Sequence, residues 1–167
     1  LTTSSAASDV YKRQVVSILS PNLYKRKFDI ICSPIHDLEK QSVTNKVIYF
    51  EGSLAKVSTK QVDENLGFIG IGGINKHYVF DQDAIIVQIE FLIGLYSKKT
   101  WHLFTSRRTP NEMIDRINNI ALTNDNLIIA NDDYDEVIKN SSIKVITQDS
   151  VNMVYESLST KGQTLLF

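Results

Sequence analysis

Short runs of apolar residues alternate along the chain with segments in which apolar residues recur every three or four positions. The short runs predict buried strands, and the longer periodic segments predict helices. The clearest helix is predicted over 82–97, where one face carries five apolar residues: Ile85, Ile89, Leu92, Ile93 and Tyr96. Further helices are predicted from Thr109, over 133–140 and from Val151 to Leu158, between strands at 15–19, 28–34, 46–50, 66–73, 100–104, 126–130, 143–147 and 164–167.

This alternation predicts an α/β fold. Continuous apolar strands are typical of a parallel sheet that is covered on both faces. Sheets of this kind bind their ligands at the carboxyl ends of the strands. Loops that follow a strand and open a helix are therefore the places where function is expected. The polar stretch STKQVDEN, residues 58–65, is predicted to link two domains.

The first residues differ from the rest of the chain. The segment SSAASDVYKRQ, residues 4–14, has neither the apolar core of a signal peptide nor an amphipathic period, and it resembles the translation of a transposase adaptor used in sequencing libraries. We therefore interpret residues 1–14 as adaptor-derived and not native. On this interpretation the natural protein extends further at its N-terminus. The last residues, GQTLLF, stop within a predicted strand and indicate the same for the C-terminus.

Composition limits the classes of partner. Lys and Arg total 18 against 19 acidic residues, so no overall positive field draws the chain to nucleic acid or to an anionic membrane. An anion site must then be local. The single cysteine excludes an internal disulfide and a cysteine-based zinc site, and it fits a reducing cytoplasm, where we expect the protein to lie. No apolar run reaches the ~18 residues of a transmembrane helix, although peripheral membrane contact stays open.

Two adjacent arginines follow a predicted strand, in the sequence TSRRTPNE at 105–112. Ser106, Arg107 and Arg108 lie at the predicted helix N-terminus, where free backbone N–H groups and the helix dipole favour an anion. Arginine adds a forked donor that suits phosphate or carboxylate. The alternative is that the arginines pair with surface acids. The next residues match a capping box with its favoured proline, in which the N-cap and the first and third helical positions are Thr109, Pro110 and Glu112.

A glycine pair ends another predicted strand, in IGIGGINKHYVFD at 69–81. Gly72 and Gly73 would let the backbone approach a ligand, and Lys76 could supply a charge to a phosphate. The spacing matches neither the dinucleotide-binding fingerprint nor the P-loop. The glycines could equally form a simple turn. His77 is a candidate catalytic base, with packing against Tyr78 as the alternative.

A third strand is followed by TQDSVNMVYES, residues 147–157. Asp149 or Ser150 is predicted to cap the helix, and Glu156 lies about two turns further on. A carboxylate there could accept hydrogen bonds from a ribose diol, or it could be a solvated helix residue. His36, next to Asp37 at the end of a strand, is a second candidate base or a structural histidine. No Ser/His/Asp set and no group of metal ligands is apparent, so we expect no metal and no cofactor.

Taken together, these loops resemble one known family. The segments DIICSPIHD, EGSLAKV, IGIGGINKHYVFD, TSRRTP and TQDSVNMVYES occur in the order found in the mitochondrial-fission "elongated mitochondria" family of plants and its bacterial relatives, from about Phe28 to Phe167. That family resembles nucleotide-sugar glycosyltransferases of the B fold. The chain departs from it at Ile74-Asn75, where relatives more often have Pro-Ser, and at 157–159, where an Ala-rich segment is usual.

The resemblance implies two Rossmann-like domains facing a cleft, with residues 15–62 forming the end of the first and 63–167 most of the second. It implies that a nucleotide-diphosphate sugar is the substrate, transferred to an unknown acceptor on an envelope or cell-surface glycan. Glu156 would hold the ribose, and His36 or His77 would be the catalytic base. The diphosphate would be bound by nine residues: Gly72, Gly73, Lys76, Ser106, Arg107, Arg108, Thr109, Asp149 and Ser150.

Two other functions remain open at this point. The cleft could serve a non-catalytic interaction protein that acts in membrane or envelope remodelling, as the fission role of the plant members suggests. The loops could also do no more than start helices in an ordinary α/β domain.

Overall fold

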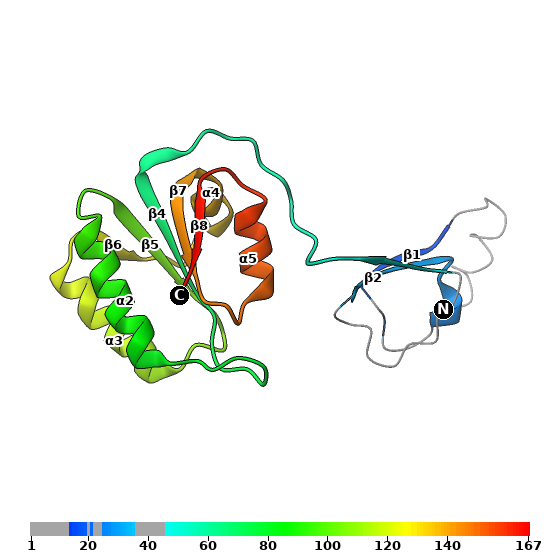
Figure 1. Cartoon of the computed structure of the whole chain (residues 1–167), viewed down its shortest axis with the longest axis horizontal. Helices are drawn as coiled ribbons and strands as arrows, with labels where there is room; N and C mark the ends of the chain where they lie inside the picture. Colours follow the sequence, from blue (N-terminus) through cyan, green and yellow to red (C-terminus); the bar gives the residue numbers. More distant parts are fainter. Residues whose placement is uncertain (1–13, 20, 22–24, 36–45) are drawn as a thin grey trace. The chain divides into compact units, whose positions relative to one another are not determined.

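The structure is a computed structural model that describes residues 14–19, 21, 25–35 and 46–167. Its contacts divide the chain into two compact units, Leu1–Ser53 and Leu54–Phe167 (Figure 1). Within the described residues, no helix is long and apolar enough to cross a membrane.

The first unit contains a parallel sheet in the order β1-β2-β3. Its strands are β1 (Val16–Ile18), β2 (Ile30–Pro34) and β3 (Val47–Phe50), and a 3-10 helix, η1 (Lys25–Lys27), precedes β2. These strands confirm the three predicted in this region. Ile31 and Ser33 in the central strand are buried. Gly52 follows β3 with a φ of 80°, a left-handed conformation that glycine adopts without steric cost.

The second unit alternates strands with helices throughout. Every predicted strand and helix of this region is present, with ends that differ by a few residues. The elements are β4 (Asp63–Ile71), α2 (Gln82–Leu95), β5 (Thr100–Thr105), α3 (Asn111–Thr123), β6 (Leu127–Ile129), α4 (Tyr134–Asn140), β7 (Ser141–Ile146), α5 (Val151–Leu158) and β8 (Gln163–Leu166).

The sheet of the second unit is parallel and has the order β6-β5-β4-β7-β8. The chain runs outward from β4 to β6, crosses back to β7 beside β4, and then continues to β8. This order is that of a Rossmann-like sheet, and the change of direction places a topological switch point between β4 and β7. The predicted α/β fold is confirmed. In such sheets the ligand edge is the crevice at the carboxyl ends of the two strands that flank the switch point.

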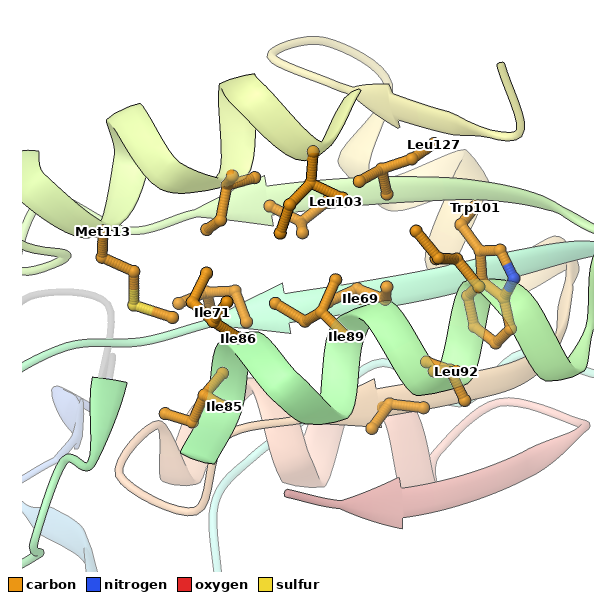
Figure 2. Close-up of a cluster of buried hydrophobic side chains, with 14 of the residues drawn as sticks. Ile69, Ile71, Ile85, Ile86, Ile89, Leu92, Trp101, Leu103, Met113 and Leu127 are labelled. Carbon is orange, nitrogen blue, oxygen red and sulfur yellow. The ribbon is translucent and has the colours of Figure 1, made fainter. Parts of the chain in front are cut away.

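Helices cover both faces of this sheet, as Figure 1 shows. On one face α2 and α3 bury apolar residues against Ile69, Ile71 and the fully buried Trp101 (Figure 2). On the other face α4 and α5 cover a smaller cluster around Phe68 and Phe104, whose rings stack with centroids 5.3 Å apart. Packing on two faces explains why the strands read as continuous apolar runs.

Residues 54–62 lie along the second unit. The backbone N–H of Ser58 donates to the Ser159 carbonyl at 2.9 Å, and Lys60 Nζ contacts Glu136 Oε2 at 2.8 Å. The polar stretch predicted as a linker is in part strand, because β4 begins at Asp63 rather than at Leu66.

Candidate functional site

Three loops meet at the carboxyl edge of the second sheet. They follow β4, β5 and β7, and each of them carries residues predicted to bind a diphosphate. The loop after β4 is joined to the loop after β7 by Gly72 N, which donates to Thr147 Oγ1 at 2.7 Å. It is joined to the loop after β5 by Ser106 Oγ, which donates to the Gly72 carbonyl at 2.8 Å. The loops thus form one hydrogen-bonded unit beside the switch point.

Asp149 is the centre of this network. Its side chain is only 2% exposed, and its Oδ2 accepts a hydrogen bond from Gly73 N at 2.8 Å. The same oxygen contacts Arg108 Nη2 at 3.0 Å. Its Oδ1 is buried and has no hydrogen-bond partner among the described residues. The Asp149 carboxylate therefore already contacts the Gly73 amide and the Arg108 guanidinium, two groups that an anionic ligand would otherwise contact.

The glycine pair is required by this internal packing. A Cβ on Gly72 would lie 2.2 Å from Asp149 Oδ2 and 2.4 Å from Oδ1. A Cβ on Gly73 would lie 2.1 Å from the backbone oxygen of Arg108. The glycines were predicted either to let a ligand approach or to form a simple turn, and here the close approach is made by the carboxylate and by the neighbouring loop.

The predicted capping box is wrong. Helix α3 begins at Asn111 with Pro110 as N-cap, and no side chain caps it. Thr109 is buried instead, and its hydroxyl donates to the Gly72 carbonyl while it accepts from Ser106 N at 2.9 Å. The Thr109 hydroxyl, predicted to cap the helix, therefore joins the loop after β5 to the loop after β4. At α5, the N-cap residue is Ser150, one of the two predicted candidates, but its side chain makes no cap hydrogen bond.

The charged side chains of these loops differ in exposure. Arg108 reaches back across the glycine turn, with Nη1 3.5 Å from the Gly73 carbonyl, and stays 44% exposed. Arg107, Lys76 and His77 are exposed, and their side chains make no ion pair or hydrogen bond with the described part of the chain. His36 lies outside the described residues.

Glu156 lies apart from this network. Its Oε2 accepts a hydrogen bond from the Tyr134 hydroxyl at 2.7 Å, between α5 and α4. Burial, followed by this contact with Glu156, raises the pKa of Tyr134, so the phenol remains a donor. The two residues line a hollow of about 120 Å³ that also involves Lys56 and Thr160. None of the residues predicted to bind a diphosphate lines that hollow.

A larger hollow opens at the carboxyl edge next to Asp149. Its volume is about 300 Å³. It is bounded by the end of the loop after β4, the first turns of α2, the start of the loop after β7 and Phe167, which follows β8. The lining residues are Tyr78, Val79, Phe80, Asp81, Ala84, Ile85, Gln88, Thr147, Gln148, Asp149 and Phe167.

The sequence was compared with known proteins. The sequence model of the family described as Mitochondrial fission ELM1 matches residues 2–167. The chain belongs to this family. A search of the curated proteins found no match.

In this member of the Mitochondrial fission ELM1 family, Asn75 organises the glycine loop, and sequence reasoning gave it no role. Its Oδ1 accepts hydrogen bonds from His77 N at 2.8 Å and Tyr78 N at 3.0 Å, and its Nδ2 donates to the Asp149 carbonyl at 3.2 Å. Asparagine shortly after a strand is a known turn former, and this is the signal that could have identified it.

Lys144 is a second residue without a predicted role. It lies in β7 and is fully buried, and its Nζ donates to Thr160 Oγ1 at 2.8 Å and to the Lys161 carbonyl. Burial lowers the pKa of Lys144 to about 8. Among the described residues, no cluster of three or more His, Cys, Asp or Glu side chains could hold a metal ion.

Proposed function

We propose that the second unit binds a nucleotide-diphosphate sugar at its carboxyl edge, and that the protein is a glycosyltransferase-like enzyme of envelope or cell-surface glycans. The observation that carries the proposal is the meeting of three cation-bearing or amide-bearing loops at the switch point of a Rossmann-like sheet. This is the edge at which such sheets bind nucleotides.

The charge balance of the loops supports an anionic ligand. Lys76, Arg107 and Arg108 carry three positive charges, and Asp149 neutralises one of them. The chain as a whole has a formal net charge of −1, so this local excess is not a reflection of overall composition. Exposed arginines suit a diphosphate, because their forked donors match its oxygens.

In the proposed reaction, Arg107, Arg108 and Lys76 stabilise the charge that develops on the leaving diphosphate. Glu156 is proposed to hold the ribose, which requires its carboxylate to exchange the Tyr134 hydroxyl for ligand hydroxyls. His77 or His36 is proposed as the base that activates the acceptor.

One observation favours a second candidate function. The Gly72 and Gly73 amides are already satisfied by Thr147 and Asp149, so two donors that a catalytic phosphate site would use are occupied within the protein. A site of this kind suits an interaction protein of the fission family that senses or retains a nucleotide sugar without turning it over.

Calorimetric titration of the 167-residue chain with UDP, GDP and their sugar derivatives tests binding. Arg107→Ala and Arg108→Ala are each expected to weaken binding on the order of ten-fold or more, because a charged hydrogen bond contributes about 1.5–3 kcal/mol. Arg116→Ala is the control, since it removes an arginine whose partner is Asp83 on a neighbouring helix. Binding that survives the double Arg107/Arg108 substitution refutes the proposed site, and binding without release of sugar favours the second candidate.

A further inference from the structure

The 300 Å³ hollow differs in chemistry from the arginine loops beside it. None of the residues that line it is Lys, Arg or His. The polar side chains among its lining residues are those of Tyr78, Asp81, Gln88, Thr147, Gln148 and Asp149, of which the Asp149 side chain is only 2% exposed. A phosphate therefore finds no cation there, whereas groups that donate hydrogen bonds find several acceptors.

The apolar part of the hollow suits a ring. Phe80, Ile85 and Phe167 contribute aromatic and aliphatic surface, and Tyr78 stands 43% exposed. Small-molecule sites combine such apolar walls with a few polar groups that fix orientation. A sugar ring offers both features, because it has C–H faces as well as hydroxyl donors.

The hollow also adjoins the proposed diphosphate site. Asp149 lines the hollow and at the same time contacts Arg108. A ligand with a diphosphate at the arginines would thus have its next group at the hollow. Arg108 pairs with Asp149, whereas Asp81 makes no ion pair within the described part of the chain and carries its charge at the N-terminus of α2.

We infer that the hollow holds the sugar ring of the ligand, and that Asp81 determines specificity by favouring an uncharged or amino sugar over a uronic acid. The inference rests on the proposed function and names the class of sugar. A carboxylate on the ring would lie near a carboxylate of like charge, with no cation lining the hollow to offset the repulsion.

Matched ligand pairs test this inference on the 167-residue chain. UDP-glucose is compared with UDP-glucuronate, and GDP-mannose with GDP-mannuronate, each against its parent diphosphate by calorimetry. The uronate is expected to bind on the order of three- to ten-fold more weakly than the neutral sugar, as a partly screened repulsion implies. Asp81→Asn should reduce that difference. Asparagine is as good an N-cap as aspartate, so the hydrogen bond that Asp81 Oδ1 accepts from Ala84 N at 3.0 Å can be kept.

Asp83→Asn is the matched control. It makes the same charge change two residues away, at an exposed side chain that does not line the hollow. It should leave the preference for the neutral sugar intact. Equal affinity for neutral and uronate ligands, with binding still dependent on Arg108, overturns the inference and leaves the proposed function standing. Failure of every nucleotide and sugar nucleotide to bind overturns both.

Discussion

Replacing Gly72 by alanine should destabilise the second unit through one identifiable clash. The new Cβ would lie 2.2, 2.4 and 2.6 Å from the three terminal atoms of the Asp149 carboxyl group. Gly72 does not need a left-handed backbone, since the positive-φ glycines of the described residues are Gly52 and Gly162. The cost is therefore steric: the carboxylate must turn away from Gly73 N and Arg108.

The expected magnitude follows from the hydrogen bond and the ion pair that this movement of the carboxylate breaks. A buried N–H left without its partner costs about 1–3 kcal/mol, and the ion pair with half-exposed Arg108 adds about 1 kcal/mol at most. Gly72→Ala should thus reduce the free energy of unfolding by about 1–4 kcal/mol. Asp149→Ala should cost a similar amount, because it removes the same acceptor. The double variant should cost no more than Asp149→Ala alone, since the clash has disappeared with the carboxylate.

Urea denaturation followed by tryptophan fluorescence measures these values. Trp101 is the single tryptophan of the chain and is fully buried in the second unit, so its emission reports that unit. Gly73→Ala is the contrasting variant, because its Cβ meets the Arg108 backbone oxygen at 2.1 Å and no side-chain truncation can relieve that contact. If the costs of Gly72→Ala and Asp149→Ala simply add, the proposed role of the carboxylate is wrong.

Two further stability predictions concern other parts of the second unit. Gly94→Ala should stabilise α2 by about 0.5–1 kcal/mol, because alanine is the better helix former and its Cβ meets nothing within 4 Å; a loss of stability in urea denaturation would contradict this. The pKa of Lys144 is about 8 in the folded state, against 10.5 for the unfolded chain. Between these two pH values the unfolded state binds more protons than the folded state, so the free energy of unfolding should rise with pH. Lys144→Met should remove that rise in a urea denaturation series that spans the two pKa values, and an unchanged slope would refute the assignment.

The architecture was predictable because it depends on local periodicity. Apolar positions three and four apart identified α2, and continuous apolar runs identified β4, β5 and β7. Once these strands are parallel neighbours, the loops that follow them must lie at one edge. The meeting of the glycine turn with the arginine loop therefore follows from pattern alone, and it required no knowledge of side-chain contacts.

The partners within that edge were not predictable, because they lie far apart in the chain. Gly73 and Asp149 are separated by 76 residues, and nothing local to either indicates the hydrogen bond between them. Thr109 matched a capping box, yet the same hydroxyl can bond a distant carbonyl, and the tertiary contact prevailed. Lys144 alternates with apolar neighbours and reads as a solvent-facing residue, whereas the segment that follows α5 covers it and accepts its hydrogen bonds.

These contacts change which residues bear on function. The glycine pair is accounted for by Asp149 and the Arg108 backbone, so glycines at this position would be needed even in a protein without a ligand. The same is true of Thr109, whose hydroxyl closes the loops. Arg107 and Lys76 are different, because no contact within the described chain explains two exposed cations at this edge. The functional proposal therefore depends on the cations, and substitutions of the glycines measure only the architecture that positions them.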